Sequence, residues 1–131
     1  MHIVPLYAGL LALLFVALSV RTLRMRRRLR IAIGDAGNEE MLRAMRVHSN
    51  FAEYVPFSLL LLFLVESSGA SAVLVHGLGL CIVAGRLSHA LGVSRLRENF
   101  AFRVFGMVMT LIPMIIAALR LLFVFASGGG G

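Results

Sequence analysis

Residues 3–30 read IVPLYAGLLALLFVALSVRTLRMRRRLR, an uncharged run of 18 residues followed by ten residues that include six arginines. An α-helix needs about 20 apolar residues to cross roughly 30 Å of hydrocarbon, so residues 3–20 predict a membrane-spanning helix. No basic segment precedes the apolar run, and the arginines follow it, unlike the order in a cleavable signal peptide. We therefore expect this segment to remain as a membrane anchor with its N-terminus outside.

Three further apolar stretches of similar length follow, at about residues 47–65, 70–91 and 104–126. The chain has 131 residues, of which 60% are hydrophobic and 15% are charged, whereas soluble domains are about 25% charged. The predicted fold class is an all-α membrane protein with a four-transmembrane-helix bundle. One domain is expected over residues 1–126, followed by a flexible glycine-rich tail at 127–131.

The positions of the arginines predict the orientation of this bundle. All 13 basic residues are arginine. Six of them follow the first apolar stretch, within residues 21–30, and Arg95, Arg97 and Arg103 follow the third. The turn at 66–71 carries none, so both basic loops are expected in the cytoplasm and both termini outside. The net charge of +7 does not indicate nucleic-acid binding, because it is concentrated between stretches that can span a bilayer.

The third stretch carries small residues at every fourth position, namely Gly77, Cys81 and Gly85. Small residues at this spacing let helices approach closely, so helix packing is the expected role of all three. Cys81 is the single cysteine, which excludes an intrachain disulfide. No Cys/His spacing typical of a metal site occurs in the sequence.

The second helix is expected to begin well before its apolar part. Asn38 can cap its N-terminus, with Glu39 and Glu40 in the first turn, and the helix should end near Ser67. Such a helix is about 43 Å long at about 1.5 Å per residue, which exceeds the bilayer core. Its first turns should therefore stand in the cytoplasm.

Residues 43–56 of this helix, RAMRVHSNFAEYVP, carry a polar stripe. At about 100° per residue, five polar side chains fall within about 100° of arc, and His48 lies well off this face. The five are Arg43, Arg46, Asn50, Glu53 and Tyr54. Glu53 lies about two turns below the expected membrane boundary, where an unpaired carboxylate costs several kcal/mol or becomes protonated. Glu53 therefore needs a partner.

Other cationic groups are expected at the same depth on the other helices. They are Arg21, Arg24, Arg86, His89 and Arg103. One interpretation is a charge network that ties the helices together, with Glu53 paired to an arginine of its own subunit. The other is a ligand site, because the arginines outnumber the carboxylates and an anionic ligand or lipid headgroup would balance them. Transport is a weaker hypothesis, because the outward half of the bundle is largely apolar.

Two motifs resemble those of the MAPEG family, the membrane-associated proteins in eicosanoid and glutathione metabolism. The first comprises Arg46, His48, Asn50, Glu53, Tyr54 and Pro56, and the second comprises Gly85, Arg86 and His89. The likeness covers nearly the whole chain, including the order of the spans and the basic loops. The sequence of residues 47–56 resembles that of the family's bacterial branch, which implies that the protein lies in a bacterial inner membrane.

The resemblance implies a homotrimer that binds glutathione, as a co-substrate, between neighbouring subunits near the cytoplasmic face. The glutathione-binding residues it implies are Arg46, Asn50, Glu53, Tyr54, Arg86 and His89, joined by Arg21 or Arg24. Arg103 matches the arginine of the fourth helix that is thought to activate the glutathione thiol. Val93 departs from the pattern, since several members carry an aromatic hydroxyl there. Val104 replaces the serine of the family's prostaglandin synthases, which argues against that isomerase activity.

The function that the resemblance implies is a glutathione-dependent transferase or peroxidase. Its second substrate would be a small lipophilic electrophile or hydroperoxide dissolved in the bilayer. The chemistry agrees with the stripe, because glutathione offers two carboxylates to arginine and an amine to Glu53. A guanidinium beside its sulfur also favours the reactive thiolate. The alternative is a non-catalytic trimeric membrane module that binds an anionic lipid or another thiol.

Overall fold

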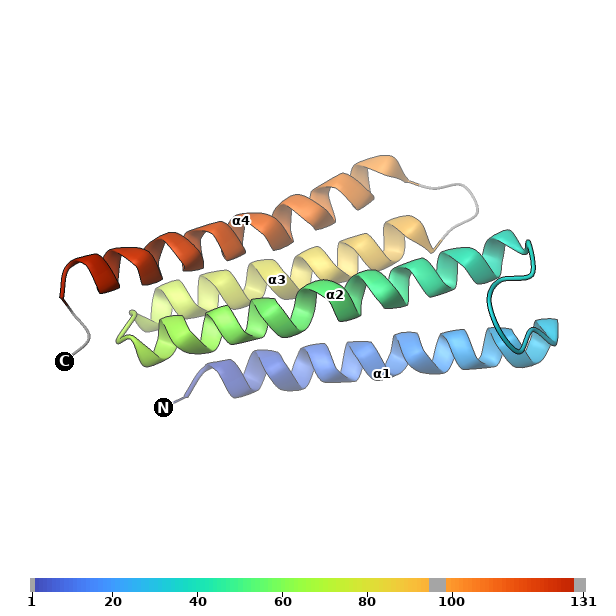
Figure 1. The fold of residues 1–131 in the computed structure, drawn as a ribbon, viewed down its shortest axis with the longest axis horizontal. Helices are drawn as coiled ribbons and strands as arrows, with labels where there is room; N and C mark the ends of the chain where they lie inside the picture. Colours follow the sequence, from blue (N-terminus) through green and yellow to red (C-terminus); the bar gives the residue numbers. More distant parts are fainter. Residues whose placement is uncertain (1, 95–98, 129–131) are drawn as a thin grey trace.

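The computed structural model describes residues 2–94 and 99–128 and consists of four long α-helices that run antiparallel, side by side (Figure 1). They are α1 (Val4–Leu29), α2 (Glu39–Ser67), α3 (Ala72–Val93) and α4 (Phe100–Ala126). No strand occurs within the described ranges. All four helices are long and apolar enough to cross a membrane. The predicted all-α, four-helix membrane bundle is confirmed.

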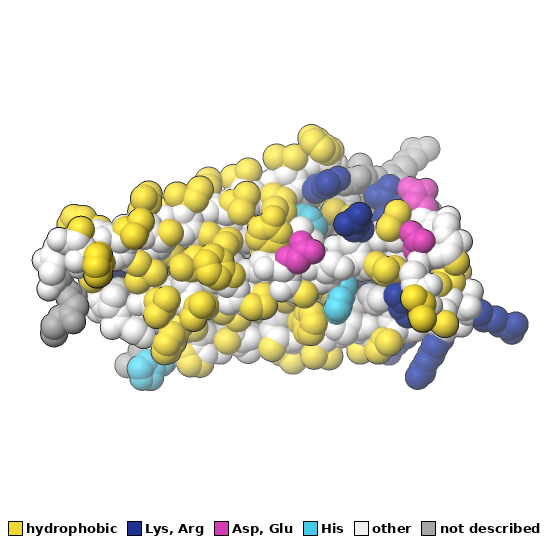
Figure 2. All heavy atoms as spheres, in the orientation of Figure 1, with side chains coloured by type: hydrophobic (Ala, Val, Ile, Leu, Met, Phe, Trp, Pro, Cys, Tyr) yellow, Lys and Arg dark blue, Asp and Glu magenta, His cyan; other side chains and the backbone are white. Residues whose placement is uncertain are grey.

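The two ends of the bundle differ in composition. We call one end the terminal end, because it contains the start of α1, the end of α4 and the turn between α2 and α3 (Figure 1). The other is the loop end, where α1 and α3 end and α2 and α4 begin. Figure 2 shows arginine side chains gathered at the loop end and hydrophobic side chains over most of the remaining surface. Which end faces the cytoplasm stays a prediction. Arg95, Arg97 and tail residues 129–131 lie outside the described residues.

Side-chain caps explain where α2 begins. The Asn38 side chain accepts a hydrogen bond from the Met41 backbone N–H at 2.9 Å, which satisfies one of the free donors of the first turn. Glu39 and Glu40 occupy that turn, and the helix ends at Ser67. Both predicted boundaries of this helix are confirmed. The turn that follows contains Gly69 at φ 77°, a left-handed conformation that glycine adopts without steric cost.

α1 is capped from outside its own segment. Ile3 stands at the N-cap position and has no side-chain acceptor, but Glu66 on α2 accepts hydrogen bonds from the backbone N–H groups of Ile3 and Val4, the latter at 3.3 Å. Close by, the Tyr7 hydroxyl lies 2.8 Å from Nδ1 of His76 on α3 and donates to the His76 carbonyl at 3.1 Å. These bonds tie α1 to α2 and α3 at the terminal end.

Glycines set the close contact between α3 and α4, the most extensively packed pair. A Cβ placed on Gly106 would lie 2.6 Å from the Gly85 carbonyl oxygen and 2.6 Å from the His89 backbone nitrogen. The expected packing role of Gly85 is therefore confirmed. Gly77 is exposed, and no described atom lies within 4 Å of a Cβ placed there, so the same expectation is wrong for Gly77 within one chain. A spacing of four residues drifts by about 40° per step around a helix, which turns Gly77 away from α4.

His48 joins α1 to α2 instead of facing the polar stripe. Its Nε2 lies 2.9 Å from the Ser19 hydroxyl, and its ring stacks on Phe15 with 4.9 Å between ring centroids. The prediction that His48 lies off the polar face of the second helix is confirmed.

Candidate functional site

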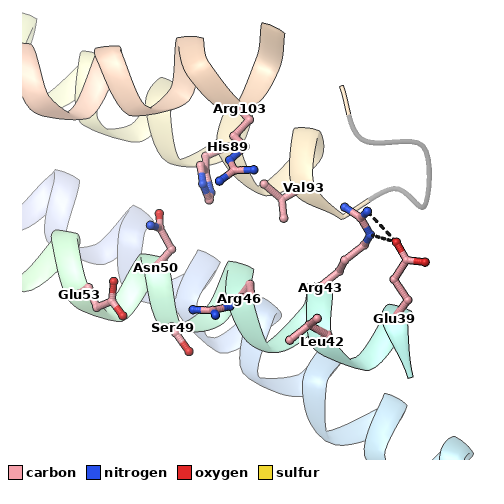
Figure 3. Close-up of a pocket in the computed structure, with 10 residues that line it drawn as sticks. All are labelled: Glu39, Leu42, Arg43, Arg46, Ser49, Asn50, Glu53, His89, Val93 and Arg103. Atoms are coloured by element: carbon pink, nitrogen blue, oxygen red, sulfur yellow. Dashed lines mark hydrogen bonds and ion pairs between the residues drawn. The ribbon is translucent and has the colours of Figure 1, made fainter. Parts of the chain in front are cut away.

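A cavity of about 540 Å³ opens between α2, α3 and α4 toward the loop end (Figure 3). Its lining residues are Glu39, Leu42, Arg43, Arg46, Ser49, Asn50, Glu53, His89, Val93 and Arg103. Ligand pockets in proteins occupy roughly 300–1,000 Å³, so this cavity can hold a small organic molecule. The polar stripe predicted from the sequence forms one wall of it.

The α2 wall follows from helical periodicity. Its lining residues recur at spacings of three or four positions, which places them on one face of the helix. From Glu39 to Glu53 this wall extends for about 21 Å at about 1.5 Å per residue. Glu53 lies at the midpoint of α2, far from either helix end. The cavity therefore runs from the first turn of the helix deep into its membrane-spanning part.

Charge along this wall is only partly compensated. Arg43 pairs with Glu39, at 2.8 Å between Nη2 and Oε1. Arg46 and Glu53 are both exposed in the single chain, and neither forms an ion pair with a residue of the described ranges. The interpretation in which Glu53 pairs with an arginine of its own subunit therefore finds no such pair among the described residues. Figure 3 shows Arg46 extended along α2 in the direction of Asn50.

The opposite wall comes from α3 and α4. His89 and Arg103 extend from these helices toward α2 (Figure 3). Close packing brings them to the cavity, because Gly106 lies directly against His89. In the same way, a Cβ on Gly92 would lie 2.9 Å from the Arg103 backbone nitrogen. Any side chain at these two glycines would push the two helices apart and displace the wall.

Arg86 does not line the cavity, although the sequence suggested that it contacts the ligand. Its side chain is 2% exposed, and its Nη1 donates to the Asn50 side-chain oxygen at 2.8 Å. Its guanidinium carbon lies 5.6 Å from the centre of the half-buried Tyr54 ring, and its Nε has no hydrogen-bond partner among the described residues. Arg86 and Tyr54 thus lie behind Asn50. Because Arg86 occupies the amide oxygen, the amide NH₂ group of Asn50 is left to donate toward the cavity.

The two arginines of α1 lie apart from this cavity. Arg21 reaches α3, where it donates to the Ser94 hydroxyl at 2.5 Å and to the Ser94 carbonyl at 3.3 Å. Arg21 and Arg24 line a separate groove on α1. Neither can therefore contact a ligand in the cavity of the same chain.

The structure thus sorts the predicted site residues into three groups. Those that line one cavity are Arg46, Asn50, Glu53, His89 and Arg103; those behind it are Tyr54 and Arg86; those on another groove are Arg21 and Arg24. Sequence reasoning missed Glu39, Leu42 and Ser49 as lining residues, although the same three- and four-residue spacing could have found them. Val93, noted in the sequence for its missing hydroxyl, contributes an apolar patch to the lining.

Comparison with known proteins agrees with this arrangement. The sequence model of the MAPEG family matches residues 4–123. Inner membrane protein YecN of Escherichia coli strain K12 is 37% identical over 114 residues, which cover 87% of this chain and 86% of that protein. The protein of the same name from Escherichia coli O6:H1, strain CFT073, gives the same values. No solved structure matches the chain significantly. The resemblance of the motifs on α2 and α3 therefore reflects common ancestry, and this integral membrane protein belongs to the MAPEG family.

Proposed function

We propose that this protein is a membrane-bound, glutathione-dependent transferase or peroxidase that acts on small lipophilic substrates. The observation that carries the proposal is that Arg46, Glu53 and Arg103 line the same cavity, which combines cations, a carboxylate and a position within the membrane-spanning helices. The family's association with glutathione metabolism supports the same ligand. The name of the Escherichia coli relatives supports a bacterial inner membrane as the location.

The cavity offers complementary groups for glutathione. Arg46 and the NH₂ group of Asn50 would donate hydrogen bonds to glutathione carboxylates, and Glu53 would accept from the α-amine. Hydrogen bonds to charged groups contribute about 1.5–3 kcal/mol each, so three such contacts would supply about 5–9 kcal/mol toward binding. Arg86 acts indirectly, because it positions the Asn50 amide.

Arg103 would supply the activation of the thiol. A free thiol has a pKa of about 8.5 and is mostly protonated at neutral pH, and a nearby guanidinium lowers that pKa. The thiolate can attack an electrophilic carbon, forming a carbon–sulfur bond as the leaving group departs. With a hydroperoxide, the thiolate sulfur attacks the terminal oxygen and the O–O bond breaks. Glutathione sulfenic acid is formed, and the alkoxide takes up the proton given off by the thiol and leaves as an alcohol. A second glutathione then converts the sulfenic acid to glutathione disulfide and water.

Assembly as a homotrimer is part of the proposal. Arg46, Ser49 and Glu53 are exposed on a helix that crosses the membrane, where charged side chains facing lipid are costly. A neighbouring subunit that covers this face would remove that cost. It would also allow Arg21 or Arg24 of the neighbour to reach the bound glutathione. In this arrangement the loop end faces the cytoplasm and both termini lie outside.

The proposal is tested by glutathione conjugation to chlorodinitrobenzene, and reduction of cumene hydroperoxide, by the purified protein and its Arg103→Ala variant. We expect the variant to lose about a hundredfold in rate, in the range for removal of one charge-stabilising donor. The apparent pKa of the pH–rate profile should rise, because the guanidinium that lowers it is gone. Absence of turnover with several substrates, together with absence of glutathione binding to the wild type, would refute the proposal.

A non-catalytic trimeric module that holds an anionic lipid or another thiol is the second candidate. The observation that favours it is Val93, an apolar lining residue where several relatives carry an aromatic hydroxyl. In that case glutathione should leave the melting temperature unchanged. A stabilisation by glutathione that disappears in Arg46→Ala would count against this second candidate.

A further inference from the structure

A second concave surface lies on one face of α1, outside the cavity described above. This α1 groove has a volume of about 510 Å³. Its lining residues are Ala17, Val20, Arg21, Arg24, Met25 and Arg28. Their spacing of three or four positions places small or apolar side chains toward one end of a single helical face and arginines toward the other.

The α1 groove lies across the boundary between the apolar and the basic part of the helix. Ala17 and Val20 belong to the uncharged run that spans the membrane, and the arginines begin directly after it. On the side of the groove nearer the terminal end, Leu13 and Val16 are 71% and 56% exposed and continue the apolar surface. The phosphate of a bilayer lipid lies at this boundary, and its acyl chains run along the apolar side.

Charge in the α1 groove is only partly balanced by the neighbouring carboxylates. Glu40 forms an ion pair with Arg28, Glu39 pairs with Arg43, and Asp35 accepts from the Gly37 backbone N–H at 3.2 Å. Arg24, in the middle of the basic half of the groove, is exposed and makes no hydrogen bond or ion pair with any residue in the described part of the chain. An anion at Arg24 would therefore meet a guanidinium that has no competing partner.

We propose that the α1 groove binds an anionic phospholipid, with the headgroup phosphate held by Arg24 and an acyl chain lying against Ala17 and Val20. The apolar end of the groove favours a lipid over a soluble phosphate, which would leave that end empty. Arg21 also lines the groove, but its guanidinium points toward α3 and is held there by Ser94, so the phosphate is assigned to Arg24. The proposal does not depend on catalytic activity.

Native mass spectrometry of the full-length protein in detergent tests this, with dioleoylphosphatidylglycerol and dioleoylphosphatidylcholine as probes. We expect preferential retention of phosphatidylglycerol. Arg24→Gln should weaken that binding about fivefold, as one arginine near a membrane surface contributes about 1 kcal/mol. The matched control is Arg27→Gln, which removes an exposed arginine that does not line the groove and should change the affinity by less than about twofold.

Ala17→Phe tests the apolar end of the groove separately. It should weaken phosphatidylglycerol binding, because the new ring occupies the surface on which the acyl chain lies. Equal retention of the two lipids, or equal losses in Arg24→Gln and Arg27→Gln, would overturn the proposal in favour of unspecific attraction. Displacement of the lipid by inorganic phosphate would overturn it in favour of a soluble anion. A loss of glutathione affinity in Arg24→Gln with unchanged lipid retention would assign Arg24 to the glutathione site instead.

Discussion

The two ends of this bundle differ in whether charged side chains line an open cavity. At the terminal end, Glu66 accepts hydrogen bonds from the first backbone N–H groups of α1, and the Tyr7 hydroxyl bonds to His76. At the loop end, Arg46 and Glu53 line an open cavity without an ion pair to any described residue. Polar groups that satisfy one another hold helices together, whereas charged groups left facing a cavity are available to a ligand.

Arg120 on α4 is an exception at the terminal half of the bundle. Its Nε is buried and has no hydrogen-bond partner among the described residues. The contrast between the two ends is therefore strong but not complete. It still predicts which substitutions reduce stability and which reduce ligand binding.

The largest effect is expected where packing builds the cavity wall. Gly106→Ala places a Cβ 2.6 Å from backbone atoms of Gly85 and His89, so α3 and α4 must separate. We expect a loss of about 3 kcal/mol in stability, at the upper end for overpacked sites, together with loss of glutathione binding. The matched control is Gly77→Ala, where the new Cβ meets no described atom. Thermal unfolding in detergent should show Gly77→Ala unchanged or slightly more stable; equal destabilisation of both would contradict the glycine contact.

The next effect concerns the unpaired charge at the loop end. Arg46→Ala should weaken glutathione binding by about 2 kcal/mol, roughly thirtyfold, because a hydrogen bond to a charged group is lost. Its melting temperature without ligand should stay near that of the wild type, since no ion pair among described residues is broken. Isothermal titration and thermal unfolding measure the two quantities. Lower stability with unchanged glutathione affinity would show that Arg46 belongs to the scaffold.

A smaller effect, on stability and not on ligand binding, is expected at the terminal end. Glu66→Ala removes the acceptor for two N–H groups of α1, and loss of a helix N-cap costs about 1 kcal/mol. The melting temperature should fall, and glutathione affinity should not change, because the cavity lies toward the other end. Glu66→Gln keeps one acceptor oxygen and should recover part of the loss. A change in glutathione affinity with either variant would argue against the separation of the two ends.

The smallest effect is expected for Tyr7→Phe, which deletes only a hydroxyl. The ring would still fill the space beside Gly79, so the cost should be limited to the hydrogen bonds with His76, about 0.5–1 kcal/mol. Thermal unfolding at several protein concentrations should detect it. A loss larger than that of Glu66→Ala would mean that the pair of Tyr7 and His76 has a role beyond joining α1 to α3.

Much of the fold was predictable because helix signals are local. The apolar runs predicted four spans, and Asn38 and Ser67 predicted the ends of α2, because caps and turns depend on a few adjacent residues. The polar face of α2 and the position of His48 off that face followed from the angle of about 100° between successive residues. These features need no knowledge of the other helices.

What the sequence did not predict depends on contacts between helices. Periodicity places Arg86 on a face of α3, but it does not tell whether the guanidinium enters the cavity or is stopped by Asn50. Likewise, the position of Arg21 and Arg24 toward the end of the first helix was predictable, whereas their separation from the cavity depends on where α1 packs. Long side chains can reach in several directions from one backbone position, and tertiary contacts select among them.

The hydrogen bonds from Ile3 and Val4 to Glu66 have a consequence for the biogenesis of the protein. The acceptor is separated from its two donors by 63 and 62 positions along the chain. Until α2 has also inserted, Glu66 cannot reach these amides, which then depend on water or lipid headgroups. Only after α2 has crossed back can the first turn of α1 be completed. We therefore expect α1 and α2 to insert stably as a pair, in which the second segment stabilises the start of the first.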